Sequence, residues 1–165
     1  MDTKIFTDGS SLGNPGPGGF CAIIETKDGN HVAKGGEIDT TNNRMEMAGI
    51  IAGLNFLRKN MPQITECAIY SDSSLIIQSM KEGWKRKKNK DLWEQIDKLI
   101  VQFKKIDWNW IRGHAGHPQN TKADKIAVEE AEKQQKLART GKTPAHKTSI
   151  AKKTTTQDPL QMSLI

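Results

Sequence analysis

The 165-residue sequence predicts an α/β domain with a mixed five-stranded sheet flanked by helices. Three runs with strand composition come first and are separated by turn signals, which is typical of antiparallel hairpins. After residue 40 the spacing of apolar residues changes to three or four, and helix-like and strand-like segments then alternate. Because strands that alternate with helices usually pair in parallel, the two halves together predict a mixed sheet.

The first three strands are predicted from apolar runs and the turns between them. Residues 4–7 (KIFT) end at an Asp-Gly pair, and the Gly- and Pro-rich stretch 10–19 is predicted to be irregular. Residues 20–26 (FCAIIET) have the composition of a second strand. A second Asp-Gly pair then favours a hairpin to residues 31–38, whose glycines indicate an edge strand.

The later elements are predicted from a change in the spacing of apolar residues. Helical spacing from Met45 to Leu57 predicts a helix of about 15 residues that ends before Pro62. The continuous apolar run at 67–70 is typical of a central strand that is buried on both faces. The remaining elements are expected to be helices at 73–80, 92–103 and 120–137 and a strand at 106–111.

Charge is distributed unevenly along the chain. The net charge is +6, yet residues 81–90 (KEGWKRKKNK, the basic segment) carry +5 and residues 138–165 carry +4, which leaves −3 on the rest. The contents of 35% hydrophobic and 27% charged residues are ordinary for a globular domain and argue against a disordered chain. A concentrated basic segment indicates contact with a polyanion such as nucleic acid.

The sequence also predicts a compartment. Cys21 and Cys67 lie in apolar runs and are expected to be buried thiols rather than a disulfide framework. No apolar stretch approaches the roughly 20 residues of a membrane span, and the N-terminus lacks the apolar region of a signal peptide. We therefore expect a soluble, cytoplasmic protein with no membrane partner, and a monomer.

Four acidic residues lie where strand ends or helix faces would meet the sheet. Asp8 ends the first strand, and Asp72 follows the strand at 67–70, where open α/β sheets bind ligands. Glu46 lies on the apolar stripe of its helix, where an unpaired carboxylate is unfavourable, and Asp124 flanks the inward face of the last helix. Clustered carboxylates suit Mg²⁺, so the pattern indicates a metal site.

Each acid also has a local explanation. Asp8 fits a turn aspartate, Glu46 a capping-box glutamate, Asp72 a helix N-cap and Asp124 a surface acid. Convergence of the four depends on the fold. His114 lies between glycines in a loop, where a histidine can transfer protons near neutral pH, or can be simply solvated.

A series of motifs resembles type 1 ribonuclease H, in that family's order, over residues 1–137. The motifs are FTDGS (6–10), GNPGPGG (13–19), TNNRME (41–46), YSDS (70–73), DLW (91–93) and GHAGHP (113–118), followed by AD at 123–124. The resemblance implies a ribonuclease H-like fold for this part of the chain. It also implies hydrolysis of the RNA strand of RNA–DNA hybrids, which leaves 5′-phosphate and 3′-hydroxyl ends.

The resemblance also assigns roles to residues. It implies two Mg²⁺ ions, with Mn²⁺ as the alternative metal, and a catalytic histidine, His114, that assists proton transfer or product release. The metal-binding catalytic carboxylates would be Asp8, Glu46, Asp72 and Asp124. Asparagines match the family positions that contact the hybrid in its minor groove, and these are Asn14, Asn42 and Asn43. The 2′-hydroxyl in this groove distinguishes RNA from DNA.

The basic segment departs from well-known bacterial members, whose corresponding handle is longer. It is expected to contact phosphates, and Trp84 is expected either to stack on a sugar of the DNA strand or to pack in the core. Ser74 stands where those members carry Gln, which alters one RNA contact. The expected phosphate contacts are Lys85, Arg86, Lys87 and Lys88, and the expected core tryptophans are Trp93, Trp108 and Trp110.

Residues 138–165 are predicted to form a basic, flexible tail beyond the catalytic domain, 1–137. Its last five residues, 161–165 (QMSLI), resemble the short peptide by which bacterial replication and repair enzymes bind the sliding clamp. Ile165 stands where that peptide usually has Phe, which weakens the match. The alternative is a chain end without a partner.

The sequence is also compatible with two other functions. One is a module that binds hybrids without cleaving them, against which the four acids and His114 argue. The other is a DNA-processing nuclease of the same fold, such as a resolvase or transposase core, which the asparagine-rich and histidine-containing motifs disfavour. Hydrolysis of hybrids is the leading hypothesis.

Overall fold

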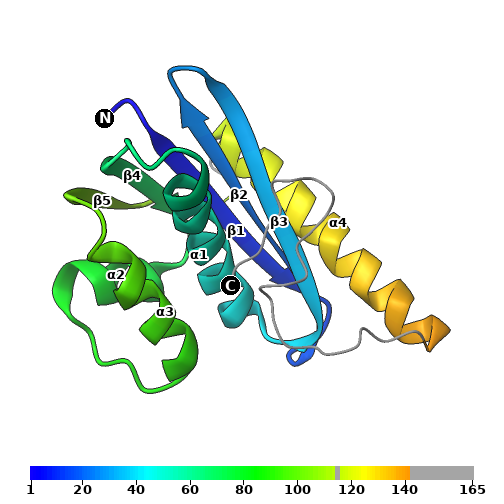
Figure 1. Cartoon of the computed structure of the whole chain (residues 1–165). Coiled ribbons are helices and arrows are strands. Elements are labelled where there is room, and N and C mark those ends of the chain that lie inside the picture. The colour runs from blue at the N-terminus through cyan, green and yellow to red at the C-terminus, as the bar shows by residue number, and fades with distance from the viewer. Residues whose placement is uncertain (114–115, 142–165) are drawn as a thin grey trace.

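The computed structural model describes residues 1–113 and 116–141, and these form one sheet with helices on both faces (Figure 1). His114 and residues 142–165, which include 161–165, lie outside the described residues. The predicted order of elements is confirmed. The elements are β1 (Lys4–Ser11), β2 (Gly16–Thr26), β3 (Gly29–Thr40), α1 (Asn42–Asn60), β4 (Glu66–Ser71), α2 (Ser74–Glu82), α3 (Lys90–Ile100), β5 (Lys105–Trp110) and α4 (Pro118–Thr140).

The five-stranded sheet is mixed, as predicted. Its order is β3-β2-β1-β4-β5, with β1, β2 and β3 antiparallel and with β4 parallel to both β1 and β5. In the pairing of β1 with β4, Phe6 lies opposite Tyr70. The carboxyl ends of these two central strands therefore meet at the same edge of the sheet, which brings Asp8 and Asp72 to the same level.

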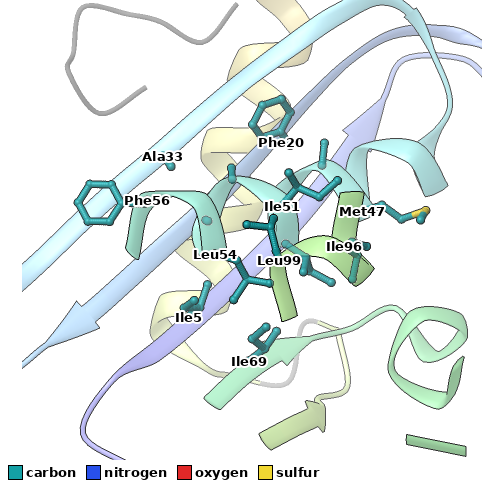
Figure 2. Packing of buried hydrophobic residues seen from close by; sticks show 14 of the residues in the cluster. Ile5, Phe20, Ala33, Met47, Ile51, Leu54, Phe56, Ile69, Ile96 and Leu99 are labelled. Carbon is teal, nitrogen blue, oxygen red and sulfur yellow. The ribbon is translucent and has the colours of Figure 1, made fainter. Parts of the chain in front are cut away.

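Two apolar cores hold the helices to the sheet. The larger lies between the sheet and helices α1 and α3, and the smaller lies beneath α4 on the opposite face (Figure 1). Side chains in the larger core include Ile5, Phe20, Ile51, Leu54 and Ile69, which pack closely together in Figure 2. The smaller core consists of Phe6, Cys21, Ile23, Ala123 and Ala127.

The strands extend further than predicted, and the expectation of irregular structure at 10–19 was partly wrong. Within this stretch, Ser10 pairs with Gly19 and Ser11 pairs with Gly18. Backbone pairing satisfies the N–H and C=O groups of these residues whatever their side-chain propensity. Turn residues therefore close a longer hairpin here, and only residues 12–15 lie outside the two strands.

The tryptophans differ in their surroundings. Trp93 is buried, and Trp108 is partly buried and packs against the larger core. Trp110 is 47% exposed, so its assignment to the core was wrong. It is the last residue of β5, which is an edge strand of the sheet.

Other expectations can be checked against the same residues. Cys21 and Cys67 are buried free thiols, as predicted. Within 1–113 and 116–141, no helix combines the length and apolarity that crossing a membrane requires. Helix α4 runs to Thr140, three residues past the expected end of the domain.

Candidate active site

Three of the predicted acids meet at the carboxyl edge of the central strands. One carboxylate oxygen from each of Asp8, Glu46 and Asp72 lies within 4.8 Å of the other two. Asp8 belongs to β1, Asp72 follows β4 directly, and Glu46 lies in the second turn of α1. Asp8 and Glu46 are buried, while Asp72 is half-buried.

The fourth acid, Asp124, approaches from the other face of the sheet. It lies on α4, is half-buried and is close enough to Asp8 to raise the pKa of that carboxyl. Glu46 on α1 also interacts with Asp8, so Asp8 is the member of the cluster that interacts with acids from both helices.

The local explanations do not account for three of the acids. Thr41 caps α1, since its side chain accepts a hydrogen bond from the N–H of Arg44 at 3.2 Å, so Glu46 lies beyond the cap. Ser73 caps α2, which excludes Asp72 from that role. Asp8 lies inside β1, which continues for three more residues and makes no turn there.

Two glycines that were interpreted only as turn residues allow the elements to converge. A Cβ on Gly9 would overlap the backbone of α1 at Met45 and Glu46. A Cβ on Gly19 would overlap the backbone of α4 at Ala127. The glycines therefore let both acid-bearing helices touch the sheet near Asp8. The sequence signal for this role, glycine within a strand, is the same as for a turn.

The backbone around Asp72 is held by the end of β5. The indole N–H of Trp110 donates a hydrogen bond to the carbonyl oxygen of Asp72 at 3.2 Å. The N–H of Ile111 donates to the carbonyl of Ser71 at 2.9 Å, and the N–H of Ser73 donates to the Ser71 hydroxyl at 3.0 Å. Assigning Trp110 to the core concealed this contact, which joins it to the candidate site.

The electrostatics of the cluster disfavour several simultaneous negative charges. Burial, together with Asp72 and Asp124, raises the pKa of Asp8 to about 7, although the N–H of Gly9 hydrogen bonds to its carboxylate and lowers it. Burial and the nearby Asp8 and Asp72 raise the pKa of Glu46 well above its usual range. The fully ionised cluster is therefore unfavourable without a compensating cation.

The residues of the cluster fit a divalent metal ion. Oε1 of Glu46 is buried and has no hydrogen-bond partner. Carboxylate oxygens are the ligands that Mg²⁺ prefers, and a bound cation would favour the ionised form of each acid. The site thus has a suitable donor set, an unsatisfied acceptor and an excess of negative charge.

The predicted substrate-binding asparagines lie at the start of α1. The side-chain oxygen of Asn14 accepts a hydrogen bond from the backbone N–H of Asn42 at 3.0 Å. Both are exposed, and Asn43 is half-buried. Asn42 is one helical turn before Glu46, so these amides and the acids lie at the same end of α1.

The basic segment presents its residues unequally. Lys85, Lys87 and Lys88 are exposed, and Trp84 is 47% exposed, which excludes the alternative of a core tryptophan. Arg86 is half-buried and binds inside the protein. Its predicted contact with phosphate stays a prediction, and in this structure its side chain lies against α3.

Arg44 joins the start of α1 to the start of α3. Its guanidinium donates to both carboxylate oxygens of Asp91, at 3.0 and 2.7 Å, and to the side-chain oxygen of Asn89 at 3.1 Å. This bridge could not be predicted from the sequence, because an ion pair between distant segments carries no local signal. It links the asparagine-bearing end of α1 to the end of the basic segment.

Known proteins share this architecture and sequence. The family model described as RNase H matches residues 1–132. A ribonuclease H of Paramagnetospirillum magneticum is 42% identical over 141 residues, which cover 76% of this chain and 87% of the relative. A ribonuclease H of Maricaulis maris is 45% identical over 135 residues, which cover 76% and 90%.

Solved structures agree with these relatives. The N-terminal RNase H domain of a Mycobacterium tuberculosis protein, solved as a fusion with maltose-binding protein, has a TM-score of 0.73 and 33% identity, and the match covers 82% of this chain and 97% of that one. LC11-RNase H1, solved in complex with an RNA/DNA hybrid, has a TM-score of 0.69 and 27% identity, with 79% and 97% covered. The fold, the carboxylate cluster and these matches show that the chain belongs to the ribonuclease H family of hydrolytic nucleases.

Proposed function

We propose that the protein hydrolyses the RNA strand of RNA–DNA hybrids and leaves 5′-phosphate and 3′-hydroxyl ends. The observation that carries this proposal is the meeting of Asp8, Glu46 and Asp72, whose carboxylate oxygens lie within 4.8 Å of one another. The hybrid bound to the family member LC11-RNase H1 supports the choice of substrate.

The acids would act as metal ligands. Asp8, Glu46, Asp72 and Asp124 would hold two Mg²⁺ ions, for which Mn²⁺ is the alternative. Bound ions would activate the attacking water and stabilise the leaving 3′ oxygen. Asp8 would be shared within the site, since it contacts acids from both α1 and α4. Its burial keeps bulk water from competing for the carboxylate.

His114 would assist proton transfer or product release. Its neighbour Gly113 lies against Asp72, since a Cβ at Gly113 would be 3.0 Å from the carboxylate oxygen Oδ2. The residue that precedes His114 in the sequence therefore lies beside the acids. An imidazole near neutral pH is suited to accept or donate the proton.

The exposed polar and basic residues would bind the two strands. Asn14, Asn42 and Asn43 would contact the RNA strand through its 2′-hydroxyls, because they border the acid-bearing end of α1. The basic segment would contact the DNA strand, with Trp84 stacked on a sugar and with Lys85, Lys87 and Lys88 on phosphates.

Cleavage assays test the proposal directly. Labelled RNA–DNA hybrid, RNA duplex and DNA duplex are incubated with the full chain, with and without Mg²⁺. We expect metal-dependent cleavage of the hybrid RNA alone, and Asp8→Asn should bind the hybrid without cleaving it. Binding without cleavage by the wild type would indicate a binding module, and cleavage of DNA duplex would indicate a DNA-processing nuclease.

The tail would add a partner. We infer that residues 161–165 bind the bacterial sliding clamp and so bring a cytoplasmic, monomeric nuclease to replication sites, where tethering raises its effective concentration. The buried free thiols agree with a reducing compartment. Retention of the chain on immobilised clamp should disappear when residues 161–165 are removed; unchanged retention would contradict the assignment.

A further inference from the structure

The guanidinium of Arg86 lies between helices α2 and α3. One of its terminal nitrogens donates to both carboxylate oxygens of Asp97, at 2.9 and 2.8 Å, and the other donates to the sulfur of Met80 at 3.4 Å. The guanidinium carbon also lies 4.3 Å from the centre of the Trp93 ring. Met80 belongs to α2, while Trp93 and Asp97 belong to α3.

These contacts occupy the groups that Arg86 would need for a phosphate. Arginine binds phosphate through its fork of N–H donors, and here both terminal nitrogens have partners inside the protein. The Arg86 side chain is 28% exposed, whereas Lys85, Lys87 and Lys88 around it are all exposed. The arginine and the lysines thus point to different surroundings, although they are consecutive in the sequence.

The same stretch is also held at its far end. Residues 83–89 of the basic segment connect α2 to α3 without regular structure. Asn89, where they end, accepts a hydrogen bond from Arg44, which lies two residues before Glu46 on α1. A connection of this kind loses conformational entropy when it is ordered by a ligand, unless the fold has already ordered it.

We propose that Arg86 is a positioning residue that fixes residues 83–89 to α3 and does not itself contact the substrate. The two arginine contacts, Arg86 with Asp97 and Arg44 with Asn89, then hold the exposed lysines at a set distance from the acids. The lysines reach the phosphates of the bound strand from a preformed surface. The identity of the ligand rests on the proposed function. The contact of Arg86 with Asp97 does not depend on it.

Asp97→Asn tests the proposal, because the two roles of Arg86 predict opposite results. If Arg86 bound phosphate, removal of its internal partner would free it and tighten binding. If Arg86 positions the segment, the dissociation constant for a labelled RNA–DNA hybrid, measured in EDTA, should rise about three- to tenfold. A matched control is Glu94→Gln, which removes the same charge from α3 at a residue paired only with Lys98 among the ion pairs of the described residues.

Arg86→Lys provides a second variant. Lysine retains the charge for a phosphate, but its single nitrogen cannot bind Asp97 and Met80 at once, and it has no planar guanidinium to lie over the Trp93 ring. We expect it to weaken hybrid binding like Asp97→Asn, and to raise KM while leaving kcat unchanged, since the acids are untouched. Wild-type affinity in Arg86→Lys, or an affinity in Asp97→Asn equal to or tighter than that of Glu94→Gln, would overturn the proposal.

A measurement without substrate separates this inference from the proposed function. Backbone ¹⁵N relaxation of residues 84–88 in the free, full-length protein should show greater mobility in Asp97→Asn than in wild type or Glu94→Gln. Unchanged mobility would overturn the positioning role even if all variants bind hybrids. If the wild type binds no hybrid, the proposed function fails, while increased mobility in Asp97→Asn still supports the contact.

Discussion

At the scale of single residues, Asp8 links the activity of this protein to its stability. Its pKa in the folded protein is about 7, against roughly 3.9 in an unfolded chain, so the metal-free fold favours the protonated acid. The contribution of Asp8 to stability is therefore complete below about pH 4 and disappears as the pH rises through 7. Mg²⁺ should reverse this loss, because metal binding favours the ionised form.

The pH dependence can be measured by comparing Asp8→Asn with wild type in urea unfolding, with a chelator present. We expect similar stability near pH 4 and an advantage for the variant of about 1–3 kcal/mol at pH 8. Added Mg²⁺ should stabilise the wild type more than the variant. A stability difference that stays constant between pH 4 and 8 would contradict the raised pKa of Asp8.

Trp110 belongs to the same scale, since a single hydrogen bond connects it to Asp72. Asp72 is the half-buried member of the cluster that it forms with Asp8 and Glu46, and it follows a strand rather than lying within one, so its orientation depends on its neighbours. Trp110→Phe removes the donor and retains an aromatic ring. We expect the Mg²⁺ dissociation constant, measured by calorimetry without substrate, to rise about three- to tenfold, as a lost hydrogen bond allows.

A structural role for Trp110 would give a different result. The indole is 47% exposed, so the shorter ring should lower the melting temperature by only a few degrees at most. Lower stability with unchanged metal affinity would show that the indole N–H does not position Asp72.

At the scale of elements, the close approach of α1 to β1 places Glu46 beside Asp8. Gly9 permits this approach, because a side chain there would overlap the backbone of the helix. Gly9→Ala should displace the start of α1, lower the free energy of unfolding by about 1–3 kcal/mol and weaken Mg²⁺ binding.

Gly53→Ala is a matched control for this change. It overcrowds the same interface near the side chain of Ile5, two helical turns past Glu46. It should lower stability and leave metal affinity close to wild type in calorimetric titration. Equal losses of metal affinity in both variants would show that packing of α1 in general, rather than contact at Gly9, sets the site.

The elements also show what the sequence could predict. The order of strands and helices follows from the spacing of apolar residues. Acids at strand ends and on an apolar helix face pointed to Asp8, Glu46 and Asp72, but only the fold shows that these three meet. The extension of β1 and β2 through 10–19 could not be predicted, since pairing partners determine it rather than propensity. The ion pair of Arg86 could not be predicted for a related reason: a run of basic residues does not reveal that Asp97 on α3 faces one of them.

At the scale of the whole molecule, the charges divide by function. The basic segment carries +5 of a net +6, while the acids of the candidate site lie in a part of the chain that is negative on balance. Bound cations would offset the negative site. Lysines that contact phosphates would displace counterions from the nucleic acid, so their contribution to binding would fall as the salt concentration rises.

This division predicts how hybrid binding depends on salt. Each lysine that contacts a phosphate contributes roughly 0.7–0.9 to the slope of log affinity against log salt concentration. Lys87→Ala should therefore reduce the slope by about that amount. It should also raise KM while leaving kcat unchanged, because Lys87 is not one of the clustered acids. Lys136→Ala on α4 removes the same charge outside the basic segment and serves as the control. Equal slopes for wild type and Lys87→Ala would contradict a phosphate contact at Lys87, and an equal reduction in both variants would indicate that net charge alone governs binding.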